Sequence, residues 1–268
     1  MAQTSTAPRK TTPNPVWTGL VLIAITTAMV LLAWHARPGL NWVFTLALMT
    51  AFLVVLGLAI TGRVNGILIN EMNLMSLSRF QMVLWTVIVV SGYFVIAIAR
   101  VKAGDVANPL AVAIDWKVWT LLGISTTSLV GSPLIMGNKK RKEPADKAKT
   151  FKVAKNAYGE DSAAVEANRS GILYGNKDVS EARFTDMFEG DELANAPLID
   201  VAKVQMFFFT ILVAIAYGAE LLHVIMVDDL TGDNMSLPVI HEGVLALMGI
   251  SHAGYLGGKS VTSTPTAS

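Results

Sequence analysis

The chain has 268 residues, of which 53% are hydrophobic and only 15% are charged, and its formal net charge at pH 7 is +1. An ordinary soluble domain has roughly a quarter charged residues, so the composition argues against a soluble protein. The near-neutral balance gives no reason to expect a nucleic-acid partner. Because cysteine is absent, disulfides, thiolate metal sites and cysteine nucleophiles are excluded.

Six apolar segments are long enough to cross a hydrocarbon core of about 30 Å as helices, since a crossing needs about 20 residues. The first is too long for the apolar part of a cleaved signal peptide, so we expect a retained helix. Tryptophans near the predicted ends support the boundaries, because their rings favour the membrane interface. The six segments are residues 16–34, 42–61, 80–99, 116–136, 204–227 and 238–257.

The distribution of basic residues predicts the orientation of these helices. If the N-terminus is cytoplasmic, seventeen Lys and Arg residues fall in cytoplasmic segments and four fall outside. Basic residues concentrate in the cytoplasmic loops of membrane proteins. We therefore expect both termini to be cytoplasmic, in a prokaryotic inner (plasma) membrane.

Composition divides the chain into six parts. The ends, 1–15 and 259–268, are rich in small and hydroxyl residues and are predicted to be disordered tails. Between them we expect an N-terminal transmembrane hairpin (16–62), a first repeat hairpin (63–137), a cytoplasmic connector (138–203) and a second repeat hairpin (204–258). The first half of the connector is too poor in apolar residues for a core and is expected to be flexible or partly helical. The stretch 184–192 is expected to lie along the membrane or to cap the bundle.

The third and fourth helices read as a copy of the fifth and sixth. Gln-Met occurs at Gln81 and at Gln205, and Thr and Tyr follow each glutamine at identical spacings. Gly-Ile-Ser then begins at Gly123 in one copy and Gly249 in the other. These shared spacings favour an internal duplication over chance. The fold class is therefore an all-α integral membrane protein with six spans, in which two duplicated hairpins run parallel about an axis along the membrane normal.

The two glutamines are expected to help cap their helices or to make interfacial hydrogen bonds, with Asp200 as an alternative cap for the fifth helix. At 100° per residue, the hydroxyl residues of each copy share one face of the helix. They are expected to bond between helices, with a hydrated path as the alternative reading. This polar stripe consists of Thr86, Tyr93, Thr210 and Tyr217.

Small residues recur at every fourth position in the fourth and sixth helices. Such rows allow close approach of helix backbones in lipid, within or between subunits. We therefore expect tight packing and a homo-oligomer, with a narrow lumen lined by these helices as the alternative. The rows are Gly123, Thr127, Gly131, Gly249, Ala253 and Gly257.

Glu220 is the costliest residue inside a predicted span, and His223 follows one turn later. His241 and Glu242 open the sixth helix across a short loop that contains acidic residues and no Lys or Arg. A carboxylate in a membrane helix usually faces the bundle or water, so these four residues are candidates for an ion or proton site. The alternative is that the fifth helix ends early and leaves Glu220 near the headgroups.

No enzyme, cofactor or metal site is expected. His252 adjoins Ser251, but neighbouring residues on a helix point about 100° apart. The glycine-rich stretch 253–260 loosely fits a phosphate-binding loop, but it lacks the preceding strand and following helix. We read it as a helix end that places Lys259 at the cytoplasmic headgroups.

Two functions remain open from the sequence. One is an oligomeric cation channel or small transporter whose path is formed by the third to sixth helices. The other is a nonconducting membrane anchor or scaffold of a larger complex, with the connector 138–203 as the docking surface for a cytoplasmic protein. Both require the lipid bilayer as a partner.

Overall fold

The computed structural model describes residues 14–104, 108–159, 161–227 and 236–267. Over these residues it contains eight α-helices and three short 3-10 helices, with isolated β-bridges and no strand. The tail 1–13 lies outside the described residues, and so does the acidic loop with Asp228, Asp229 and Asp233.

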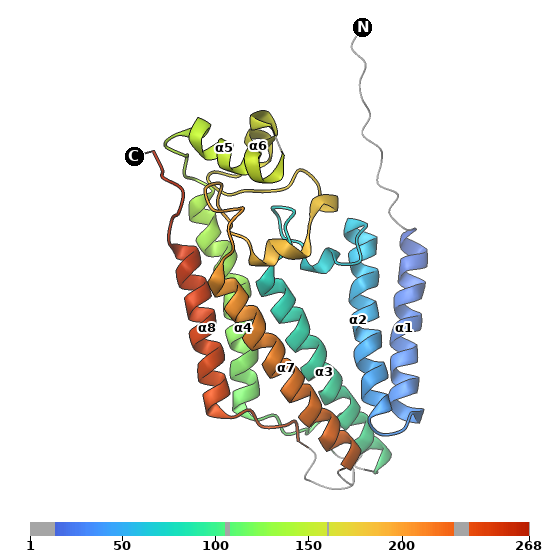
Figure 1. The fold of residues 1–268 in the computed structure, drawn as a ribbon. Helices are drawn as coiled ribbons and strands as arrows, with labels where there is room; N and C mark the ends of the chain where they lie inside the picture. Colours follow the sequence, from blue (N-terminus) through green and yellow to red (C-terminus); the bar gives the residue numbers. More distant parts are fainter. Residues whose placement is uncertain (1–13, 105–107, 160, 228–235, 268) are drawn as a thin grey trace.

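Four long helices form a bundle in which each packs against two neighbours, in the order α3, α4, α8 and α7 around it. They are α3 (Leu77–Lys102), α4 (Trp116–Lys139), α7 (Val201–Val227) and α8 (Glu242–Ser260). A hairpin of α1 (Pro15–His35) and α2 (Leu40–Thr61) lies outside the bundle against α3 (Figure 1). The indole N–H of Trp42 on α2 donates to Ser91 Oγ on α3 over 2.9 Å.

Among the described residues, five helices are long and apolar enough to cross a membrane, namely α1, α2, α3, α4 and α7. The chain is therefore a membrane-embedded all-α protein with several spans. The sixth predicted span corresponds to α8, which is not one of these five, because Glu242, His252 and Lys259 and five glycines make its 19 residues less apolar. It lies alongside α4 and α7 in the bundle (Figure 1).

Short polar residues begin most of the bundle helices. Asp115 Oδ1 accepts from Lys117 N at the start of α4, and Asp200 Oδ1 accepts from Ala202 N and Lys203 N at the start of α7. The expected cap by Asp200 is thus confirmed. By contrast, α3 begins after Ser76 without any side-chain cap.

The connector folds at one end of the bundle, which we term the connector end (Figure 1). Its first half contains α5 (Lys147–Tyr158) and α6 (Ser162–Asn168), followed by η2 (Val179–Glu181) and η3 (Phe184–Phe188). A small core with Phe151, Val165, Tyr174 and Leu193 holds it together, so the expectation that it has no core was wrong. The aromatic stretch caps the bundle, with Phe188 edge-on to Phe207 of α7.

The segment that follows α8 is ordered, whereas the sequence predicted a disordered tail over 259–268. Residues 259 and 260 complete α8. The next residues join the connector, since Ala145 N donates to Pro265 O over 2.9 Å and Ala267 N to Glu143 O over 3.0 Å. This segment is ordered because its backbone groups form hydrogen bonds with the connector. The sequence did not predict these contacts.

The two hairpins are not equally buried. Gln81, at the start of α3, is fully buried and donates to Thr210 Oγ1 of α7, whereas the corresponding Gln205 is exposed. Neither glutamine therefore takes part in the capping we expected. The α1–α2 hairpin packs against α3, whereas Phe208, Leu212 and Ile215 on α7 are exposed.

Single-cysteine labelling tests how the helices cross the membrane, because the chain has no cysteine of its own. We expect a cysteine at exposed Lys177, in the connector, and one at exposed Leu110, between α3 and α4, to react with an impermeant maleimide from opposite sides of the membrane. Lys177→Cys should be protected in intact cells and Leu110→Cys labelled. Labelling of both from the same side would contradict the arrangement.

Candidate functional site

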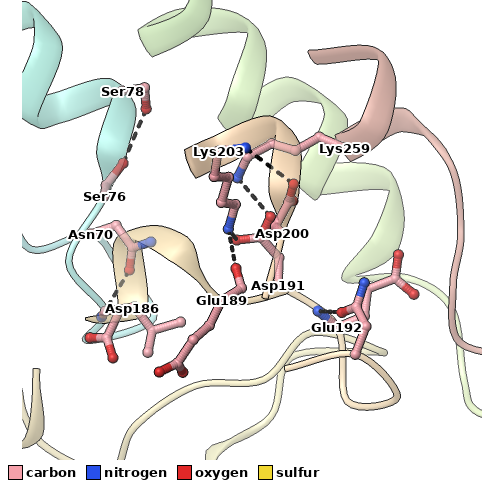
Figure 2. A network of polar contacts seen from close by, with 12 residues as sticks. Asn70, Ser76, Ser78, Asp186, Glu189, Asp191, Glu192, Asp200, Lys203 and Lys259 are labelled. Carbon is pink, nitrogen blue, oxygen red and sulfur yellow. Dashed lines mark hydrogen bonds and ion pairs between the residues drawn. The ribbon is translucent and has the colours of Figure 1, made fainter. Parts of the chain in front are cut away.

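A cavity of about 420 Å³ lies at the connector end, between the starts of α3 and α7, the ends of α4 and α8, and the connector. We term it the connector-end cavity. Charged and hydroxyl side chains from four chain segments converge around it (Figure 2). Its polar wall includes Ser76, Ser78, Arg79, Asp186, Asp191, Lys203 and Lys259, and its apolar wall includes Met82, Val83, Leu129 and Met136.

Asp191 is shared by two buried lysines. Its Oδ1 lies 2.9 Å from Lys203 Nζ and its Oδ2 lies 2.9 Å from Lys259 Nζ. Burial raises the pKa of Asp191, but the two ammonium groups outweigh it and hold the pKa well below its ordinary value. The expectation that Lys259 sits among lipid headgroups was wrong, because its ammonium is drawn inward by this carboxylate.

A second buried ion pair stands beside the first. Lys139 Nζ, at the end of α4, lies 2.5 Å from Glu192 Oε1, and their side chains are 5% and 2% exposed. The other oxygen of Glu192 accepts from Ser263 N and Thr264 N over 2.9 and 2.6 Å. One carboxylate therefore joins the connector, α4 and the segment after α8.

Asp186 is buried with one oxygen unused. Its Oδ2 accepts from Met75 N and Arg183 N over 3.1 and 2.8 Å, while Oδ1 has no hydrogen-bond partner. Arg183 Nε lies 3.7 Å from that oxygen, beyond hydrogen-bond distance. Burial raises the pKa of Asp186, and the two backbone hydrogen bonds oppose the shift only partly.

The start of α3 adds a positive wall to the cavity. Its first N–H groups have no side-chain cap, and such groups at a helix N-terminus attract anions. Arg79 lies in this first turn, half-buried and facing the cavity, with no ion-pair partner among the described residues. The Arg79 guanidinium and the uncapped N–H groups of α3 therefore lie on the same wall of the cavity.

Buried polar atoms also run along the interior of the bundle. Ser128 Oγ on α4 lies 2.6 Å from His252 Nδ1 on α8, and His252 Nε2 has no partner. The hydroxyls of Ser125 on α4 and Ser251 on α8 are both buried and have no hydrogen-bond partner within the described part of the chain. Three further unpartnered atoms belong to Gln81, Trp85 and Tyr217. We term these side chains, together with Thr210, the polar seam.

The four ion-site candidates lie near the far end of the bundle, and the structure brings two of them together. Glu220 and His241 are exposed and line one pocket of about 320 Å³, beside Tyr217. His223 is exposed outside this pocket. Glu242 instead lies 3.5 Å from Lys117 Nζ at the start of α4.

The predicted hydroxyl stripe divides between the two hairpins. Thr210 and Tyr217 are buried in the bundle. Thr86 and Tyr93 are half-buried, and Tyr93 donates to Leu110 O over 3.0 Å.

Of the predicted small residues, two lie at the contact between α4 and α8. Gly131 faces Leu256 and Gly249 faces Ile124. Gly123, Thr127, Ala253 and Gly257 are exposed on the outer side.

Sequence reasoning missed the residues of the connector-end cavity. The signal was present as the acidic stretch 186–192 placed just before Lys203, but spacing alone does not show which charges meet. Among the described residues, no cluster of three His, Asp or Glu side chains forms a metal site. Comparisons with protein-family models, curated proteins and solved structures returned no match. The class of the protein is therefore defined by its own structure, a polytopic membrane protein with a folded polar cap.

Substitution of Glu192 tests the buried pair. We expect Glu192→Gln to lower the free energy of unfolding by about 3 kcal/mol, because it leaves a buried lysine without its counter-ion. Amide hydrogen exchange at Ser263 and Thr264 should accelerate. Glu71→Gln is the matched control, since its pair with Lys140 is half exposed and should contribute less than about 1 kcal/mol. Equal effects of the two changes would contradict the role of burial.

The two cavity aspartates should respond to pH in opposite ways. A lowered pKa means that ionised Asp191 stabilises the fold, so Asp191→Asn should lower the melting temperature at pH 7 and lose its effect only below the ordinary pKa of 3.8. A raised pKa means that ionised Asp186 costs stability, so Asp186→Asn should raise the melting temperature at pH 7. That gain should vanish as the pH falls from the raised pKa to 3.8. Melting curves of both variants across the acid range check the signs, and a shift of the same sign for both would contradict the assignment.

Proposed function

We propose that the chain is a small transporter of protons or small cations, in which the bundle of α3, α4, α7 and α8 forms the path. In this proposal α8 is the sixth span, the two hairpins are duplicated copies, and the connector is cytoplasmic. The observation that carries the proposal is the polar seam. Buried polar atoms without partners are costly, and in a membrane bundle they favour a hydrated path.

The seam lies between two openings. Tyr255 and Lys259 line the connector-end cavity one to two turns from His252 on the same helix. Tyr217 belongs to the seam and also lines the far pocket, beside Glu220 and His241. A proton that entered at either end would meet hydroxyl, imidazole and carboxylate groups in sequence, and these are the groups of membrane proton relays.

A nonconducting anchor is the second candidate, favoured by the filling of the bundle. Large side chains such as Trp85, Leu121, Leu221 and Met248 are fully buried along its interior. The folded connector and the segment after α8 then supply a rigid docking surface for a cytoplasmic partner. A homo-oligomer, joined through exposed small residues such as Ala253, is compatible with either function.

Proton flux in proteoliposomes tests the first candidate. With a potassium diffusion potential and a trapped pH dye, the protein should acidify vesicles faster than protein-free liposomes do. Replacing Ser125 and Ser251 by Ala should slow flux about tenfold, the effect of roughly 1.4 kcal/mol on a barrier. Glu220→Gln should also slow it.

Thr127→Val is the matched control, because it removes a hydroxyl from α4 two residues from Ser125 but on the exposed face. If the Ser-to-Ala variants and Thr127→Val change the proton flux equally, the path does not follow the polar seam. No flux from any folded variant would leave the anchor as the better function, and recovery of a stable soluble partner through the connector would then support it.

A further inference from the structure

We infer that the connector-end cavity binds a phosphate ester that also carries a primary ammonium group. This chemistry occurs both in a phospholipid headgroup and in a free small molecule. The inference concerns binding at equilibrium and stands whether or not the bundle conducts. Over the described residues, it is carried by three features of the cavity: a wall with an arginine that has no ion-pair partner beside an uncapped helix start, a buried carboxylate with one oxygen free of hydrogen bonds, and an apolar extension.

The cationic wall suits the phosphate. Arg79 has no ion-pair partner among the described residues and lies in the uncapped first turn of α3. A guanidinium beside free backbone N–H groups is a strong phosphate-binding combination. Lys203 adds capacity, since its ammonium has three donors and contacts only Glu189 O and Asp191 Oδ1. Ser76 and Ser78, whose hydroxyls lie 3.0 Å apart, stand on the same wall.

The buried carboxylate suits the ammonium. Asp186 is 6% exposed and lines the cavity with Oδ1 free of hydrogen bonds. A purely anionic ligand would be repelled by this oxygen, whereas a ligand with an N–H donor satisfies it. Because a buried acceptor without a partner is costly, an N–H donor of the ligand at Asp186 Oδ1 removes that cost.

The apolar extension suits an acyl chain. Met82 and Val83 on α3 and Leu129 and Pro133 on α4 continue the cavity below its polar wall, along partly exposed faces of the spanning helices. Pro133 lies six residues before the end of α4, about 9 Å deep at 1.5 Å per residue. A headgroup at the polar wall would leave its chain beside these residues, so the lipid is the source that the shape favours.

Binding to the purified full chain tests the inference. Isothermal titration calorimetry would measure O-phosphoethanolamine and inorganic phosphate in detergent. Native mass spectrometry would measure retention of phosphatidylethanolamine against phosphatidylcholine, whose methylated nitrogen has no N–H to donate. We expect Arg79→Gln to weaken binding at least about tenfold, as loss of one charge-assisted contact implies. Arg141→Gln is the matched control, since Arg141 is exposed at the same end and outside the cavity.

Asp186→Asn separates the two halves of the ligand. It should abolish the preference for O-phosphoethanolamine over inorganic phosphate, or for phosphatidylethanolamine over phosphatidylcholine, while phosphate affinity persists. Saturable binding of the free ester supports a soluble ligand, and retention of the lipid alone supports a headgroup. Equal effects of Arg79→Gln and Arg141→Gln, a preference unchanged by Asp186→Asn, or no binding of any probe would each overturn the inference. Circular dichroism of the variants confirms that they are folded.

Discussion

The connector end depends on one carboxylate that two cations share. Asp191 holds Lys203 at the start of α7 and Lys259 at the end of α8, so the two helices of the second hairpin are fixed to the connector at their facing ends. Ion pairs out of water must be closely matched, since the loss of hydration is large. Here each oxygen of Asp191 takes one ammonium, and the neighbouring Glu192 repeats the arrangement with Lys139 and two backbone amides. These pairs fix the connector to the ends of α4, α7 and α8, beside the connector-end cavity.

Much of the fold was predictable from the sequence because the bilayer imposes a simple rule. Apolar runs of about 20 residues must be helices in lipid, and five of the predicted spans appear as helices of suitable length. The cap at Asp200 was predictable for a similar reason, since short polar side chains bond the first amides of the next helix. Composition alone does not decide whether the least apolar of the six segments, α8, crosses the membrane.

The site was much less predictable, because it is built from contacts distant in sequence. Glu220 was predicted as a site residue because it is an acid within an apolar segment. Helical periodicity did not show that its side chain is exposed, whereas that of the neighbouring Leu221 is buried. Conversely, the stretch 184–192 was expected to lie along the membrane or to cap the bundle, and its sequence did not show that Asp191 and Glu192 form ion pairs. Glu192 pairs with Lys139, and Asp191 pairs with Lys203 and Lys259, which approach from three helices. The residues that share one face of a helix can be read from their spacing in the sequence. Ion pairs between distant segments form only when the bundle has assembled, so spacing does not reveal them.

The segment after α8 gives the polar cap a place in the order of assembly. Glu192 and Lys139 are made early, but the amides of Ser263 and Thr264 and the carbonyl of Val261 arrive only after α8 has been synthesised. The last bundle helix and the polar cap therefore depend on each other, because the residues that follow α8 complete the partners of both Glu192 and Lys139.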